Sequence, residues 1–101
     1  MTPHEMLEAT ADRIEHGPWG RGWKGPCVLH IMQNVVLEAL GLPPMNAHLA
    51  AIFKHDVHRA CIDAMHREVD TASSLASWQD HPQRTKEEVV TMVRNAKRFL
   101  P

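Results

Sequence analysis

The chain has 101 residues, of which 44% are hydrophobic and 23% are charged, and its formal net charge is −1. These values are those of an ordinary soluble domain and exclude a disordered or fibrous protein. No apolar run approaches the roughly 18 residues of a membrane span, and no basic and then apolar leader opens the chain. We therefore expect one domain, residues 1–101, in the cytoplasm and without a membrane partner.

Charge and cysteine content further restrict the class of protein to which this chain can belong. Two cysteines are too few for a disulfide framework, so reduced thiols are expected. The near-neutral net charge disfavours a general nucleic-acid binder. Charge is nevertheless uneven: Glu5 to Glu15 holds four acids and one arginine, whereas Arg84 to Arg98 holds five bases and two acids.

The first predicted element is a helix over residues 3–16. Thr2 and Glu5 have the spacing of a capping box, and Pro3 occupies the first helical position. Gly17 followed by Pro18 predicts a left-handed helix end. The apolar positions recur at helical spacing, namely Leu7, Ala11 and Ile14.

A glycine- and tryptophan-containing loop, residues 17–26, precedes a mostly apolar segment from Cys27 to Leu40. Tryptophan is costly to leave in water, so we expect the indoles to close the core. The apolar segment is longer than a usual strand and stops at Gly41, which predicts a central, mostly buried helix.

Asn46 is a good N-cap for a third helix that could reach Val69. Its predicted buried face contains Leu49, Phe53, Val57, Ala60 and Ala64. Because a helix over this whole stretch would be about 36 Å long, a bend or break near residues 54–56 is expected.

Two elements complete the chain. Ser73 or Ser74 is expected to cap a short turn, and Thr85 with Glu88 forms a second capping box before a last helix. The buried face of that helix is predicted to contain Val89, Val93, Ala96 and Leu100. Every periodic segment has the helical period, so the sequence predicts an all-α fold, a compact bundle of four to five helices.

Histidines and cysteines repeat one spacing on two of the predicted helices. If those helices packed face to face, a tetrahedral zinc site could form. The opposing interpretation treats the cysteines as small buried hydrophobes and places the histidines on a solvated face. A cysteine nucleophile with a histidine base is the enzymatic variant, and the sequence favours it less. The candidate metal ligands are Cys27, His30, His55, His58 and Cys61.

Two further segments are candidates for binding. Trp19, Arg21 and Trp23 interleave aromatic and basic groups, as a partner-binding or base-stacking surface would. The last helix carries Arg94, Lys97 and Arg98, which could contact phosphate, or which simply form a solvated turn favoured by the helix dipole.

The segment from Trp78 to Asp80, followed by Arg84-Thr85-Lys86-Glu87-Glu88-Val89, together with the loop around Trp19, resembles a family of small proteins of unknown function from actinobacteria and their phages. That family has a G-W loop, a Cys-led helix and a W-N-D segment before R-T-x-x-E-V. Here Gln79 stands in place of the asparagine, and the start of the second helix differs. The resemblance implies a phage or actinobacterial accessory protein, in the host cytoplasm if phage-encoded, and no activity or cofactor.

We interpret the Trp78 to Glu88 segment as scaffold: Trp78 would anchor it in the core, Asp80 would pair with Arg84, and Thr85 with Glu88 would cap the last helix. The leading hypothesis is a small helical protein-interaction module without a cofactor, which binds a host or bacterial protein, or a second copy of itself, through leftover apolar surface on the second or third helix. The alternatives are a zinc-binding protein and a nucleic-acid-binding module, and an enzyme is the less favoured class.

Overall fold

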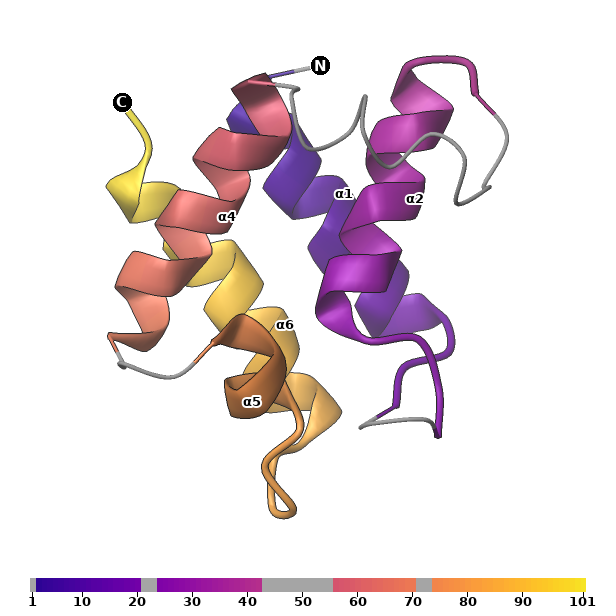
Figure 1. Ribbon diagram of the computed structural model, residues 1–101, viewed down its shortest axis with the longest axis vertical. Helices are drawn as coiled ribbons and strands as arrows, with labels where there is room; N and C mark the ends of the chain where they lie inside the picture. The colour runs from indigo at the N-terminus through magenta and orange to yellow at the C-terminus, as the bar shows by residue number, and fades with distance from the viewer. Residues whose placement is uncertain (1, 21–23, 43–55, 71–73) are drawn as a thin grey trace.

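The computed structural model describes residues 2–20, 24–42, 56–70 and 74–101, and helices form the framework of these ranges (Figure 1). None of the described residues lies in a β-strand, so the all-α prediction is confirmed. The elements are α1 (Pro3–His16), α2 (Val28–Ala39), α4 (Asp56–Val69), α5 (Leu75–Gln79), α6 (Lys86–Asn95) and the 3-10 helix η2 (Ala96–Phe99).

Both predicted capping boxes are present, and they explain where α1 and α6 begin. The Thr2 hydroxyl accepts a hydrogen bond from the Glu5 backbone N–H, and the Glu5 carboxylate accepts one from the Thr2 N–H. Thr85 and Glu88 make the same reciprocal pair at the start of α6. Each box satisfies two backbone donors that a helix start would otherwise leave without partners.

The end of α1 differs from its prediction. Gly17 has extended backbone, with φ −133° and ψ −171°, and not the left-handed conformation. The reason is Pro18, because a residue before proline is pushed towards extended dihedrals. A Cβ at Gly17 would lie 2.8 Å from the Arg13 carbonyl oxygen, so the glycine is needed for close approach. Gly41, after α2, does adopt the left-handed conformation with φ 73°.

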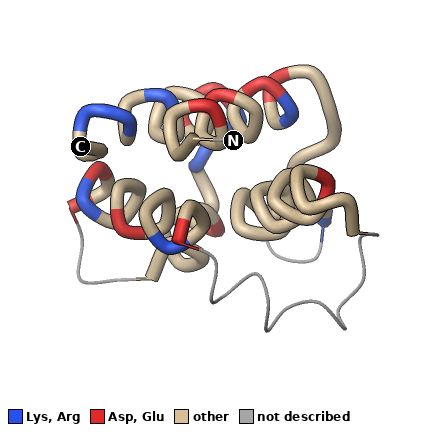
Figure 2. Tube along the Cα trace, turned by 90° about the horizontal axis from the view of Figure 1, so that it is seen from above, with Lys and Arg blue, Asp and Glu red and all other residues tan. Residues whose placement is uncertain are grey.

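The described helices form two layers (Figures 1 and 2). α1 and α6, which η2 continues, make one layer, and α2, α4 and α5 make the other. α1 packs against α6, α2 and α4. The radius of gyration is 12.6 Å, close to the roughly 13 Å of a compact domain of this length. No helix in the described part of the chain is both long and apolar enough to cross a membrane.

Each α-helix of the described ranges contributes residues to the core, and α2 is mostly buried as predicted. The buried face of α4, however, is rotated from the predicted one: Val57 and Ala60 are only half-buried, and the buried residues are His58, Cys61, Ala64 and Met65. The rotation places the thiol of Cys61 3.5 Å from the Pro3 carbonyl of α1. Asn46, Leu49 and Phe53 lie outside the described residues.

At the C-terminal end, Val89, Val93 and Ala96 are buried as predicted, whereas Leu100 is half-buried. The helix tightens into η2 from Ala96 onwards.

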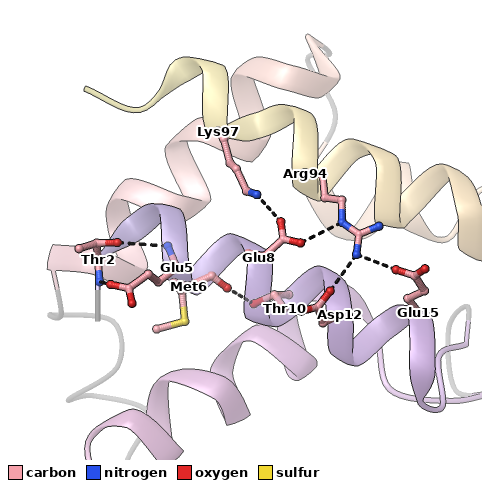
Figure 3. Close-up of polar contacts among 9 residues, drawn as sticks. All are labelled: Thr2, Glu5, Met6, Glu8, Thr10, Asp12, Glu15, Arg94 and Lys97. Carbon is pink, nitrogen blue, oxygen red and sulfur yellow. Dashed lines mark hydrogen bonds and ion pairs between the residues drawn. The ribbon is translucent and has the colours of Figure 1, made fainter.

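The acidic start and the basic end of the chain meet between α1 and α6 (Figure 3). Arg94 donates to Glu8 at 3.3 Å, to Asp12 at 2.8 Å and to Glu15 at 2.6 Å, and Lys97 donates to Glu8. The three carboxylates lie on one face of α1, about one helical turn apart. Exposed ion pairs each contribute only about 0–1 kcal/mol, so this cluster mainly sets the register of the two helices.

One buried amide joins three segments of the chain. The Gln79 side chain, at the end of α5, has no exposed surface. Its oxygen accepts from the Trp19 indole N–H at 3.0 Å and from the Val28 backbone N–H at 2.6 Å. Its nitrogen donates to the Asp80 carboxylate at 2.7 Å and to the Gly20 carbonyl at 3.4 Å. The loop after α1, the start of α2 and the end of α5 are thereby held together.

We predict that Gln79→Leu strongly destabilises the protein. The substitution leaves the buried Val28 N–H and the half-buried Trp19 indole N–H without their acceptor, and a buried donor without a partner costs about 1–3 kcal/mol. Urea denaturation should show a loss of about 2–4 kcal/mol in the free energy of unfolding. Gln83→Leu, at an exposed glutamine, is the matched control and should change it little. A Gln79→Leu protein as stable as the control would contradict this role.

We also predict that stability falls in acid. The hydrogen bond from Lys97 lowers the pKa of Glu8 below its ordinary value of 4.5, and the hydrogen bond from Arg13 does the same for Glu38. Because these pKa values are lower in the folded than in the unfolded protein, their stabilisation is present above about pH 4.5 and is lost as the pH falls through the folded values.

Denaturation midpoints between neutral pH and about pH 3 should test this dependence. Glu8→Gln should flatten it, whereas Glu87→Gln should not, because Glu87 forms no ion pair with the described residues. Equal slopes for both variants would refute the contribution of Glu8.

Candidate functional site

A groove lies between α2 and α4, with α5 as its floor, and we name it the α2/α4 groove. Its volume is about 510 Å³, within the range of about 300–1,000 Å³ that is typical of ligand sites. α2 and α4 both pack on α1, which holds the two walls apart from behind. The lining residues are Leu29, Gln33, His58, Arg59, Ile62, Asp63, His66, Ser74, Leu75 and Ala76.

Helical spacing produces each wall. His58, Ile62 and His66 follow one another at intervals of four residues, so they lie along one face of α4. On the opposite wall, Leu29 and Gln33 are one turn apart on α2. The apolar side chains of the described lining are Leu29, Ile62, Leu75 and Ala76, and the polar ones include the buried His58.

The charges at the groove's edge are already paired within α4. Arg59 is 3.0 Å from the Asp56 carboxylate, and Asp63 is 3.2 Å from the Arg67 guanidinium. The α2 wall contributes no Lys, Arg, Asp or Glu between Val28 and Leu37. Histidines aside, the described lining residues carry no net charge, because Arg59 and Asp63 balance one another.

His58 is the most buried polar group of the groove. Only 3% of its surface is exposed, whereas His66, two turns further along α4, is exposed. The expectation that the histidines share a solvated face is thus wrong for His58. The reason is the rotation of α4, which turns this residue towards the core instead of Val57.

The candidate zinc ligands are distributed over different parts of the described structure. Cys27 caps α2, and its sulfur accepts from the His30 backbone N–H at 3.5 Å, whereas the His30 side chain is exposed. Cys61 lies beside the first residue of α1. Within the described ranges, no three His, Cys, Asp or Glu side chains form a group that could hold a metal ion. His55 lies outside those ranges, so the zinc site stays a prediction.

Of the tryptophan loop, only Trp19 among the candidate binding residues is described, since Arg21 and Trp23 lie outside the described ranges. The Trp19 indole packs against the core, and its N–H donates to Gln79. This is the core-closing role that we expected as the alternative to partner binding. Both polar and apolar parts of this side chain are engaged within the protein.

The scaffold segment is arranged partly as expected. Trp78 is half-buried at the edge of the core, and the Arg84 guanidinium stacks on its ring at 3.8 Å from the ring centre. Arg84 pairs with Glu88 at 3.1 Å and not with Asp80, which accepts from Gln79. Gln79, not Trp78, is the buried anchor, because its amide supplies both a donor and an acceptor.

The bases of the last helix face carboxylates of the same chain. Arg94 and Lys97 contact the acids of α1 (Figure 3), and Arg98 is 2.7 Å from Glu68 of α4. Phosphate would have to compete with these carboxylates. Arg94 and Lys97 keep about one-third of their side-chain surface exposed and Arg98 keeps 64%, so the basic turn is in part solvated and in part paired with carboxylates.

The two cysteines should differ in reactivity. Burial raises the pKa of the Cys61 thiol to about 12, so it stays protonated at neutral pH, and the thiolate is the reactive form. We predict that iodoacetamide modifies the half-buried Cys27 in the native protein and Cys61 only after unfolding, as mass spectrometry would show. A Cys27→Ser variant, which keeps a capping side chain, should remain unmodified when native. Native labelling of Cys61 in this variant would disprove the assignment.

Comparison with known proteins places the chain in a family. Residues 1–99 match the model of a family of unknown function, DUF6197. The comparisons with curated proteins and with solved structures gave no match. The matched range includes both walls of the α2/α4 groove, its floor and the Gln79 amide. The chain therefore belongs to the DUF6197 family of unknown function.

Proposed function

We propose that the chain is a phage or actinobacterial accessory protein that acts in the cytoplasm as a helical protein-interaction module, and that it binds a host or bacterial protein in the α2/α4 groove. The apolar groove between α2 and α4 supports this proposal most directly. A concave apolar surface with a few polar groups at its edge is the usual form of a binding site. The phage or actinobacterial origin rests on the resemblance of the Trp78 to Val89 segment.

The distribution of charge favours a protein over a nucleic acid as the partner. Nucleic-acid binding depends on cations that neutralise phosphates. Arg59 is the one lysine or arginine among the groove's described lining residues, and it pairs with Asp56. Arg94 and Lys97 are held by carboxylates of α1. Apolar protein side chains, by contrast, suit a groove lined by Leu29, Ile62 and Leu75.

Site-specific photo-crosslinking in the cells that encode the chain, or in infected host cells, tests this function. A photoreactive residue replaces Gln33 inside the groove, or Leu40 outside it, in the full-length chain. Leu40 is 42% exposed and is not among the described lining residues. We predict a discrete protein adduct from position 33 that is absent from position 40. Adding Ala76→Phe, which fills the groove from α5, should remove the adduct.

Three results would contradict the proposal. Equal adducts from both positions would show contact without groove specificity, and no adduct at position 33 would show that the groove is not used. An adduct of twice the chain's mass would show that the partner is a second copy of this protein and not a different protein.

A further inference from the structure

We infer that the occupant of the α2/α4 groove is a short amphipathic helix of the partner, laid along α4 with an uncharged apolar face towards Leu29, Ile62 and Leu75. This inference rests on the proposed function and specifies the partner's chemistry. Three properties of the groove carry it: its length, the hydrogen-bonding state of its walls and its charge.

The length of the groove corresponds to about two helical turns. The α4 wall runs from His58 to His66, which at 1.5 Å per residue is about 12 Å. Two turns of a helix present apolar side chains at positions i, i+3, i+4 and i+7 on one face. Such a face matches the spacing of the lining residues on α4, where the side chains also repeat every four residues.

The walls favour a helix over an extended peptide. α2 and α4 are helices, so their backbone N–H and C=O groups are used internally and offer no edge for strand addition. An extended segment would place its own backbone groups against Leu29, Ile62 and Leu75 without partners, and each buried unpaired group is costly. A helix brings its backbone already hydrogen-bonded.

Charge complementarity defines the face that enters. Arg59 and Asp63 are paired with Asp56 and Arg67, and the α2 wall between Val28 and Leu37 carries no charged residue. Beside Leu29, Ile62 and Leu75, a charged side chain of the partner would lose water without a described residue that offers it an unpaired counter-ion. The buried face of the occupant is therefore uncharged.

A second copy of the chain is a poorer match. Filling a concave groove requires a convex apolar ridge from the occupant. Among the described residues, the one large hydrophobic side chain that is exposed is Leu40, at 42%. Two grooves placed face to face would enclose empty space and lose the contacts that stabilise an apolar interface.

Titration of the full-length, ¹⁵N-labelled protein with model peptides tests the inference. The probe is a capped peptide of about 16 residues, long enough to form a helix, with leucines at i, i+3, i+4 and i+7 and Glu, Lys and Gln elsewhere. A scrambled peptide of the same composition is the matched control. We expect saturable shifts of the Leu29, Gln33, Ile62 and Ala76 amides with a Kd of about 1 mM or tighter, and no saturation with the scrambled peptide.

Variants locate the binding. Ile62→Glu places a charge in the groove and should weaken binding at least tenfold, about 1.4 kcal/mol. Leu40→Glu, the same kind of change outside the groove, should leave the Kd unchanged. Ile62 packs against the core, so a loss of binding in Ile62→Glu must be separated from unfolding. Ala76→Phe gives an independent block of the groove from α5. It should also weaken binding at least tenfold.

The outcomes separate this inference from the proposed function. Equal binding of the scrambled peptide, or shifts confined to other surfaces, would overturn the helical occupant. The helical occupant would also be overturned if a small apolar probe such as anilinonaphthalene sulfonate bound at the groove and the peptide did not bind at all. NOE contacts between the groove walls and residues 43–55 of the same chain would also overturn it, because the groove would then be filled internally.

The crosslinking result decides which proposal has failed. If position 33 forms a protein adduct but the helical peptide does not bind, only the helical occupant is refuted. If neither occurs, both proposals fail.

Discussion

The arrangement of this protein depends on the buried Gln79 amide, which ties the loop after α1 and the start of α2 to the end of α5. A buried polar group is tolerated only when its partners are present, so these three segments must come together as a unit. α5 is thereby fixed against the beginning of α2, on the side where Leu75 and Ala76 form the floor of the α2/α4 groove. The amide thus positions the site without belonging to its lining.

Local signals predicted most of the helix boundaries. The Thr2 and Thr85 capping boxes and the glycine after α2 each act within a few residues, so their signals can be recognised in the sequence without knowing which helices pack together. The face that α4 buries was predicted less well, because it depends on which neighbours it meets. The predicted stripe placed Val57 and Ala60 inward, whereas in the structure His58 and Cys61 are buried and the Cys61 thiol lies 3.5 Å from the Pro3 carbonyl.

The candidate site could not be read from the sequence because its residues come from three segments that local patterns do not connect. Leu29, Ile62 and Leu75 are ordinary apolar residues in their own helices, and nothing in their spacing indicates a shared groove. Gln79 was noticed only as the residue that replaces an asparagine in a resembling family. Its role depends on Trp19 and Val28, which are 60 and 51 residues away. The uneven charge was visible, but not that Arg94 would meet the acids of α1.

α1 explains how a small protein can keep an apolar groove open. It packs against α6, α2 and α4, and its buried residues include Met6, Leu7, Ala11 and Ile14. Each groove wall is therefore stabilised from behind, by α1, and neither wall requires the other to fill the space between them. The ion pairs of α1 with Arg94 and Lys97 also set the register between α1 and the layer partner α6, which η2 continues. A groove supported in this way does not need a ligand in order to form, and a preformed site lowers the ordering cost of the binding that we propose.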